Sequence, residues 1–267
     1  MKIKAASAYG RRIEKVFSTE RTALGVLRGL AVPQVFDMRL SEVPFMNGNH
    51  DLALGLSEGR AAFLIETYEG ETFHEHRSTK RMQPHTIAGV WLFCLEQFVA
   101  FRRHQLLYTD IKCHNVVISS GRPRRVVIVD FDRIVPLASG SGWQNFGATR
   151  DYEPPELRSG PPSEASCVYQ LALLLVHFLA NGDNRTLRDE NRGLPKVAAV
   201  LHRAGAAPLF KLVESSLRNN PRQRPRDYEA MLGAVKRMNI PSRSLRVWRE
   251  LRAPYVSRLA EIGLEGM

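Results

Sequence analysis

The sequence of 267 residues has few cysteines, no hydrophobic run long enough to cross a membrane, and no low-complexity linker. Its three cysteines, Cys94, Cys113 and Cys167, are too scattered for a disulfide framework, and none has a C-x-x-C partner typical of a metal site. The most apolar run, residues 171–180, is about half the roughly 20 residues that span a bilayer, and it predicts a buried helix. These absences exclude a disulfide scaffold and a transmembrane segment.

No basic stretch followed by an apolar core and a small-residue cleavage site opens the chain, so the sequence gives no indication of general secretory export. We therefore expect a cytoplasmic protein. Delivery into another cell by a specialised secretion system would leave no signal of this kind and stays open.

Positive charge is in excess, with 38 Lys and Arg against 27 Asp and Glu, while 44% hydrophobic residues indicate an ordinary globular core. Such a balance can favour nucleic acids, anionic membranes or phosphorylated ligands. The basic residues occur in short groups at 102–103, 122–125 and 222–226 without interleaved aromatic residues. This pattern favours a solvated basic surface over a dedicated nucleic-acid site.

The first part of the chain predicts a short strand, a helix and a hairpin. Residues 1–7 alternate weakly as a strand, and a helix follows from residue 18 until Pro33 ends it. Runs 51–56 and 61–68 resemble two strands joined by a turn at Glu58-Gly59. A change from strand to helix character near Glu69-Gly70 predicts a boundary between a small lobe and a large one.

The second part is mainly helical, around one hairpin. Apolar residues at helical spacing predict a long amphipathic helix over 84–104, with Trp91, Phe93 and Phe98 in the core. Runs 115–119 and 126–130 predict a strand hairpin, and helices follow from residue 163 onward. The expected fold class is therefore α+β, with a lobe at 1–69, a larger lobe at 70–240 and a helical extension at 241–267.

The loop before the hairpin carries a set of residues suited to phosphoryl transfer. Asp110, Lys112 and Asn115 stand at relative positions 0, +2 and +5, and Asp130 ends the next strand, beside them across the hairpin. Phosphoryl transfer needs a carboxylate to accept a hydroxyl proton, an ammonium to balance charge, and oxygen ligands for Mg²⁺. An unrelated fold could carry the same residues by chance, which is the competing interpretation.

Several motifs in order along the chain resemble the eukaryotic-type protein kinase family. The segments YTD (108–110), DFD (130–132) and YEPPE (152–156) resemble its His-Arg-Asp, Asp-Phe-Gly and Ala-Pro-Glu motifs. The segment NPRQRP (220–225) resembles a late Asp-Pro-x-x-Arg-Pro element, which implies a buried ion pair between Glu156 and Arg224. The resemblance implies a bilobal fold with a reduced small β lobe and a large, mainly helical lobe.

The same resemblance implies roles for individual residues. Asp110 and Lys112 would be catalytic, Asn115 and Asp130 would hold Mg²⁺, and Thr149 would lie in the loop that receives the substrate hydroxyl. In the small lobe, Lys4 resembles the phosphate-binding Lys and Glu20 its helix partner, with Lys2 as a rival on the same strand face. Glu66 and Tyr68 resemble the hinge segment that holds adenine.

Departures from the family are equally specific. No Gly-rich loop precedes Lys4, so either the start lies further upstream, the chain has been trimmed, or this is a minimal kinase. Thr109 replaces the Arg that reads an activation-loop phosphate, and Asp132 replaces a flexible Gly. Cys167 replaces an Asp that braces the catalytic loop, which predicts a weaker brace because a thiol is a poor acceptor.

The leading prediction is a Ser/Thr protein kinase that uses ATP and Mg²⁺ and acts on an unidentified protein. A pseudokinase that serves as a binding or scaffolding module, and a small-molecule kinase of similar fold, are the alternatives. We expect His114 only to shape the loop, because no second metal ligand stands at useful spacing, and no pairing marks Cys113 as a nucleophile. In the extension, Leu245, Val247 and Trp248 predict a helix that packs on the large lobe or on a partner.

Overall fold

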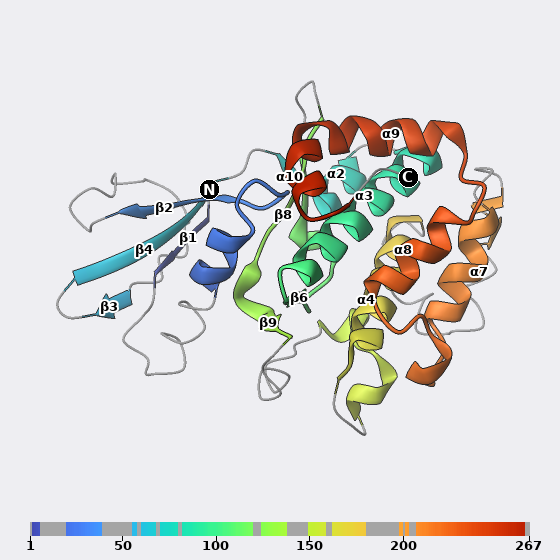
Figure 1. Cartoon of the computed structure of the whole chain (residues 1–267), viewed down its shortest axis with the longest axis horizontal. Helices are drawn as coiled ribbons and strands as arrows, with labels where there is room; N and C mark the ends of the chain where they lie inside the picture. The colour runs from blue at the N-terminus through green and yellow to red at the C-terminus, as the bar shows by residue number, and fades with distance from the viewer. Residues whose placement is uncertain are drawn as a thin grey trace.

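The computed structural model describes residues 2–5, 20–38, 55–57, 60–67, 70–79, 82–119, 124–137, 149–158, 162–179, 198–199, 201–202 and 207–264. The architecture is α+β, with mostly helical content and small sheets (Figure 1). The strands are β1 (Lys2–Ala5), β2 (Gln34–Met38), β3 (Gly55–Ser57), β4 (Arg60–Thr67), β5 (Glu71–Thr72), β6 (Leu106–Tyr108), β7 (Val116–Ile118), β8 (Val126–Ile128) and β9 (Ile134–Pro136). The α-helices with complete bounds are α2 (Phe73–Thr79), α3 (Pro84–Arg103), α4 (Glu164–Leu179), α7 (Ala207–Ser216), α8 (Tyr228–Lys236), α9 (Ser242–Arg252) and α10 (Val256–Glu261).

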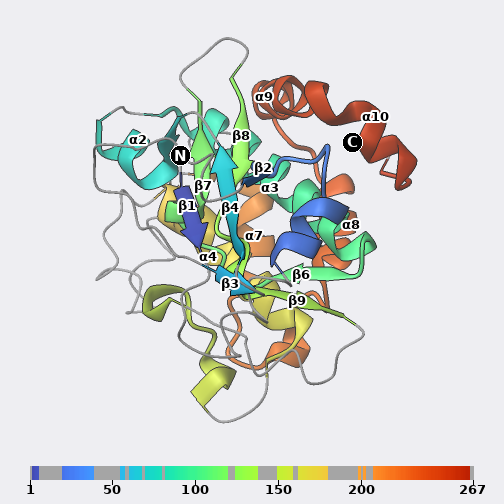
Figure 2. The same ribbon diagram turned by 90° about the vertical axis from the view of Figure 1, so that its left-hand side faces the viewer.

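The first sheet has β4 at its centre, with β1 and β2 antiparallel on either side and β3 paired to β4 as a hairpin (Figure 2). Strands β1 and β4 confirm two predicted strands, and β3 coincides with only the end of the predicted run 51–56. Strand β2 was not predicted. It follows Pro33 directly, and its sequence QVFDM has the apolar Val35 and Phe36 next to each other, so no alternation indicates a strand.

The chain forms a helix over residues 20–26 and continues towards the helical body. Leu24, Leu27 and Leu30 are buried, as their spacing predicts. The helix ends at Val26 in a series of turns, so Pro33 is not the residue that ends it. Ala31 then bonds to the body through both backbone groups. Its N–H donates to Gln97 Oε1 at 3.0 Å, and its carbonyl accepts from Ile128 N at 2.8 Å.

A second sheet, β5-β7-β8, carries the predicted hairpin, and a third pairs β6 with β9. The chain enters this region through Gly70, whose φ is +141°. A Cβ at this position would collide with the backbone carbonyl of Ile118, so glycine is required for both its conformation and the close approach. Gly70 lies where the sequence predicts the change from strand to helix character.

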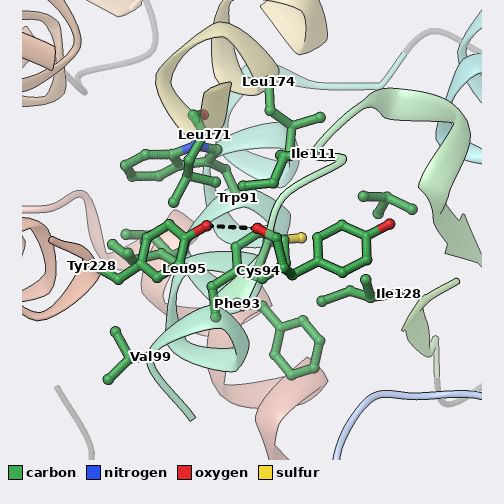
Figure 3. Packing of buried hydrophobic residues seen from close by; sticks show 14 of the residues in the cluster. Trp91, Phe93, Cys94, Leu95, Val99, Ile111, Ile128, Leu171, Leu174 and Tyr228 are labelled. Atoms are coloured by element: carbon green, nitrogen blue, oxygen red, sulfur yellow. Dashed lines mark hydrogen bonds between the residues drawn. The ribbon is translucent and has the colours of Figure 1, made fainter. Parts of the chain in front are cut away.

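Helix α3 is the centre of the helical body, and its buried stretch covers residues 87–101 on every side. The helix was correctly predicted, but its amphipathic character was not. Glu96 and Gln97 would face water in an amphipathic helix, whereas here other segments of the chain cover them. Trp91 and Phe93 are in the core, as expected (Figure 3). Phe98 is also buried, as expected.

The remaining helices surround α3. Helix α4 is buried almost throughout and confirms the buried helix predicted from the apolar run at 171–180. The C-terminal extension forms α9 and α10, and α9 runs across α3, which confirms packing on the helical body (Figure 1). Among the residues that the structure describes, no helix is both long and apolar enough to cross a membrane.

Candidate active site

The candidate catalytic loop runs from the end of β6 to the start of β7 and includes a 3-10 turn, Cys113–Asn115. It is anchored by Tyr108, whose hydroxyl donates to Val129 O at 2.7 Å and accepts from Asn115 Nδ2 at 2.9 Å. Val129 N–H in turn donates to Asn115 O at 3.0 Å. These bonds fix the loop against the end of β8, where Asp130 follows.

The carboxylate of Asp110 lies at the centre of the site and is 4% exposed as a residue. Its Oδ2 atom accepts from Lys112 Nζ at 2.5 Å and from Asn115 Nδ2 at 3.3 Å. Its Oδ1 atom accepts from the Thr149 hydroxyl at 3.2 Å. Three residues predicted to belong to the site therefore donate to the carboxylate of the fourth.

Asp130 is in the left-handed region, with φ 69° and ψ 67°, a conformation that Asp tolerates better than most side chains. It follows Val129, whose carbonyl accepts from the Tyr108 hydroxyl and whose N–H donates to Asn115 O. Burial raises the pKa of the Tyr108 hydroxyl well above its ordinary value, and the negative charges of Asp130 and Asp110 raise it further. Both carboxylates thus act on one buried phenol.

Thr109, which stands in place of an Arg, has a structural partner. Its hydroxyl donates to the carbonyl of Arg133 at 2.5 Å and so ties the loop to the turn after Asp130. Phe131 packs its ring against Tyr108, with centroids 5.2 Å apart. These two contacts attach the segment 130–133 to the segment 108–110.

The brace expected to be weak at Cys167 is supplied by another residue. The Tyr228 hydroxyl donates to the Tyr108 carbonyl at 3.1 Å, directly before Thr109 and Asp110 (Figure 3). Cys167 is buried beside Tyr228, and burial raises the pKa of its thiol to about 12. The sequence offered no way to find Tyr228, because it lies 120 residues from Tyr108.

The predicted ion pair between Glu156 and Arg224 is confirmed. The guanidinium binds both carboxylate oxygens, at 2.7 and 2.8 Å, and Ser166 also donates to Glu156, at 2.6 Å. Burial alone would raise the pKa of Glu156, but these hydrogen bonds outweigh it and hold the pKa below its ordinary value.

The small-lobe residues are described less completely. The backbone of β1 pairs Lys2 with Glu66 and Lys4 with Leu64, and Glu20 lies in the helix at 20–26 with 2% exposure. The side chains of Lys4 and Glu66, and Tyr68 as a whole, lie outside the described residues. The Lys4–Glu20 pairing and the adenine contacts thus stay predictions.

A histidine that sequence reasoning missed also joins the loop. The Nδ1 atom of His74, on α2, lies 3.8 Å from the Cys113 sulfur, and the His74 ring stacks on that of His114 with centroids 4.2 Å apart. Burial, followed by the positive charges of His74 and Lys112, lowers the pKa of His114. The sequence shows no second metal ligand at useful spacing from His114. In the folded chain, however, His74 from α2 lies next to it.

The donor set fits a hard divalent cation such as Mg²⁺. Asn115 uses its amide nitrogen for hydrogen bonds to Tyr108 and Asp110, which leaves its oxygen, Oδ1, as the atom that could coordinate a cation. Asp130, the second oxygen ligand that the sequence predicts, follows the end of β8. Oxygen ligands of these two types are those that Mg²⁺ prefers.

Comparison with known proteins gives a consistent but partial result. The chain is 28% identical over 188 residues to the serine/threonine-protein kinase PknL of two Mycobacterium tuberculosis strains and of Mycobacterium bovis. The alignment covers 65% of this chain and 46% of PknL, so the chain spans about half the length of these relatives. No protein-family model matches the chain. The similarity is to a protein-kinase-like family.

Proposed function

We propose that this protein is a Ser/Thr protein kinase of the bilobal fold that transfers the γ-phosphoryl group of ATP to a protein hydroxyl. The observation that carries the proposal is the Asp110 carboxylate, which accepts from a threonine hydroxyl on one oxygen and from Lys112 on the other. A general base must lie about 2.6–3.2 Å from the hydroxyl whose proton it accepts. Similarity to PknL supports the same conclusion.

In the proposed reaction, a substrate hydroxyl takes a position on Asp110 like that of the Thr149 hydroxyl. Its oxygen forms the new bond to the γ-phosphorus, its proton passes to Asp110, and the bridging oxygen leaves with ADP. Lys112 balances the negative charge of the phosphoryl group during transfer. Asn115 and Asp130 would hold Mg²⁺, which would neutralise charge on the phosphates.

The small lobe would bind the nucleotide. In this proposal Lys4, paired with Glu20, contacts the α- and β-phosphates, while Glu66 and Tyr68 belong to the segment that holds adenine. The sheet β1-β4-β2 supplies the frame, since β4 leads directly towards Tyr68.

The test is incorporation of labelled phosphate from Mg-ATP into a mixture of casein and histone. Asp110→Asn should lower incorporation by about 10²–10⁴-fold, because a positioned general base contributes that much, while circular dichroism stays unchanged. Glu250→Gln removes one exposed carboxylate from α9 and should leave the rate unchanged. The matched pair separates loss of a base from loss of a charge.

Equal incorporation by the wild type and Asp110→Asn would reject the catalytic assignment. If the wild type neither binds Mg-ATP in calorimetry nor transfers phosphate, a binding or scaffolding module becomes the better description. Phosphate transfer to small alcohols but not to proteins would favour a small-molecule kinase.

A further inference from the structure

Three side chains that bind transition metals meet on the surface, one from α2 and two from the candidate catalytic loop. The Cys113 sulfur lies 3.8 Å from His74 Nδ1 and 3.7 Å from His114 Nδ1. The ligand atoms of all three residues lie within 4.8 Å of one another. We propose that His74, Cys113 and His114 form a binding site for a divalent transition metal ion, with Zn²⁺ as the preferred ion.

The sheet topology explains how residues 39 positions apart come together. Strand β5 pairs antiparallel with β7, and Thr72 lies opposite Val117 in this ladder. His74 comes two residues after Thr72, and His114 comes three residues before Val117. The two strands of an antiparallel pair run in opposite directions, so positions after Thr72 and positions before Val117 lie at the same end of the ladder. Both histidines therefore lie at that end.

The start of α2, which carries His74, is held in place independently of any metal. The Thr72 hydroxyl accepts from Glu75 N at 3.2 Å, and the Glu75 carboxylate accepts from Thr72 N at 2.9 Å, which is a capping box. Phe73 is fully buried and stacks on Phe178 of α4, with ring centroids 3.6 Å apart. His74 is therefore attached to a fixed helix start.

The loop side is equally well anchored. Cys113 N–H donates to the buried Tyr152 hydroxyl at 3.1 Å, and Asn115, the residue after His114, is held by Tyr108 and Asp110. Cys113 and His114 lie between these two anchors. Two fixed elements thus present three ligands with little backbone to order on binding, which favours affinity.

The distances suit tetrahedral coordination. A sulfur about 2.3 Å and a nitrogen about 2.0–2.1 Å from Zn²⁺, on tetrahedral directions, lie about 3.6 Å apart. Both observed sulfur–nitrogen separations are close to this value, at 3.7 and 3.8 Å. Both histidines are exposed, so small rotations of their rings can complete the geometry.

The ligand types select the class of ion. A thiolate with two imidazoles suits Zn²⁺ and its neighbours in the transition series, whereas Mg²⁺ and Ca²⁺ prefer oxygen ligands. Three protein ligands leave a fourth position for water, which is accessible because the group is on the surface. The proposed site is therefore chemically distinct from the oxygen ligands Asn115 and Asp130.

A thiol can also form weak hydrogen bonds to imidazole nitrogens at these distances, so the test must separate coordination from hydrogen bonding. The full chain is freed of metal with a chelator and titrated with Co²⁺ and with Zn²⁺. We expect one Co²⁺ per chain with a thiolate-to-cobalt charge-transfer band, and Zn²⁺ should displace it. Cys94 and Cys167 are buried, so Cys113 is the cysteine that can give this band.

Three variants and one control make the assignment specific. Cys113→Ser, which keeps hydrogen bonding but removes the thiolate, should abolish the band. His74→Gln and His114→Gln should each weaken Zn²⁺ binding by more than about 100-fold, because even outer-shell partners of ligands are worth 10–100-fold. His85→Gln, at the start of α3 and outside the group, should bind as the wild type does.

Metal binding also has a readout that does not depend on any enzymatic activity. At a hundredfold excess of Zn²⁺ over its Kd, the Tm of the wild type should rise by roughly 5 °C, and that of Cys113→Ser should not. The proposal is overturned if the wild type shows no thiolate band. It is also overturned if the band or the affinity survives in both histidine variants, since the thiol would then bind metal without the imidazoles.

Discussion

Helix α3 has two opposite faces that are equally buried but held by different interactions. Trp91 and Phe98, seven residues apart, define the face towards the candidate catalytic loop, which we term the loop face. Gly89 and Glu96, also seven apart, define the face towards α9, which we term the α9 face. Residues seven apart lie on one side of a helix, and a shift of two residues turns by about 200°.

The loop face is aromatic, and its hydrogen-bonding and stacking partners are uncharged. Trp91 donates to the Leu171 carbonyl at 2.8 Å, and the Phe98 ring stacks with Tyr108 and Tyr228, each at a centroid distance of 5.6 Å. These contacts hold the two tyrosines that position the loop. Stiff aromatic packing is suited to fixing side chains within a small fraction of an ångström.

The α9 face combines a close helix approach with a buried ion pair. Gly89 allows the backbone of α9 to come near, and Glu96 binds Arg252 Nε at 2.8 Å and Trp248 Nε1 at 3.2 Å. Removing either half of such a pair is costly because the other half stays buried without a partner. The difference between the faces separates contacts that position a site from contacts that attach a helix.

Two glutamate–arginine pairs, the partly buried Glu156–Arg224 and the buried Glu96–Arg252, sharpen this comparison. Glu156 receives two bonds from the Arg224 fork and one from Ser166, and its pKa is lowered. Glu96 has a side chain only 3% exposed, and burial raises its pKa despite Arg252 and Trp248. Hydrogen bonding therefore decides the pKa near the site, and desolvation decides it under α9.

The largest loss of stability on the α9 face should come from Arg252→Ala. This change leaves the Glu96 carboxylate buried without its cation and removes a bond to the Leu264 carbonyl, so the free energy of unfolding should fall by about 3–5 kcal/mol. Urea denaturation measures the loss. Arg249→Ala, exposed on the same helix, is the control and should change it by less than about 0.5 kcal/mol.

If Arg252→Ala behaved like Arg249→Ala, the ion pair would contribute nothing and the comparison would fail. Adding Glu96→Gln to Arg252→Ala should recover part of the loss, since no charge would stay buried.

A smaller loss is expected for Gly89→Ala. A Cβ here would lie 2.8 Å from the Ser244 carbonyl and 2.6 Å from Val247 Cβ, so α9 must move, at a cost of about 1–3 kcal/mol. Gly233→Ala on α8 is the matched control, because its Cβ would meet Arg237 Nη1 at an ordinary 3.6 Å. Thermal unfolding should show a lower Tm for Gly89→Ala alone. An equal Tm in both variants would mean that α9 is not packed this closely.

On the loop face, Tyr228→Phe should have a modest effect on stability and a larger relative effect on the proposed transfer. Loss of the hydroxyl removes one bond to Tyr108, worth about 0.5–1.5 kcal/mol, and loosens the residue before Thr109 and Asp110. We expect the transfer rate to fall several-fold with a nearly unchanged Tm. Tyr255→Phe, whose ring packs on Phe93, is the control and should keep its rate. Equal rates would show that the bond does not position the loop.

The smallest expected effect is an opposite pH dependence of the contributions that the two glutamates make to stability. The lowered pKa of Glu156 means that its contribution to stability is present above its ordinary pKa of 4.5 and is lost as pH falls through the lower, folded value. The raised pKa of Glu96 means that its contribution is present below 4.5 and is lost as pH rises through the higher, folded value.

Urea denaturation of Glu156→Gln and Glu96→Gln across this range tests the signs. The difference in stability between the wild type and Glu156→Gln should shrink on acidification below pH 4.5. The difference between the wild type and Glu96→Gln should change above pH 4.5, where the wild type should gain stability relative to the variant as pH falls. Parallel curves for the two variants would contradict the contrast between hydrogen bonding and desolvation.

Much of the secondary structure of the helical body could be predicted from the sequence, because the patterns that indicate its helices and strands are local. The spacing of apolar residues in α3 and α4, and the apolar runs of β7 and β8, needed no knowledge of partners. The loop residues Asp110, Lys112 and Asn115 were found for the same reason, since their chemistry is contained in six consecutive positions. Strand β2 was missed because its sequence, QVFDM, does not alternate between apolar and polar residues.

Only the tertiary structure decided which residues far apart in the sequence contact one another. Tyr228 as the brace of the loop, Arg252 as the partner of Glu96, and His74 beside Cys113 lie 120, 156 and 39 residues from the groups that they contact. No periodicity or spacing relates such positions. Chain topology and close packing choose them, so the sequence by itself determined which residues could do chemistry, and the fold decided which of them meet.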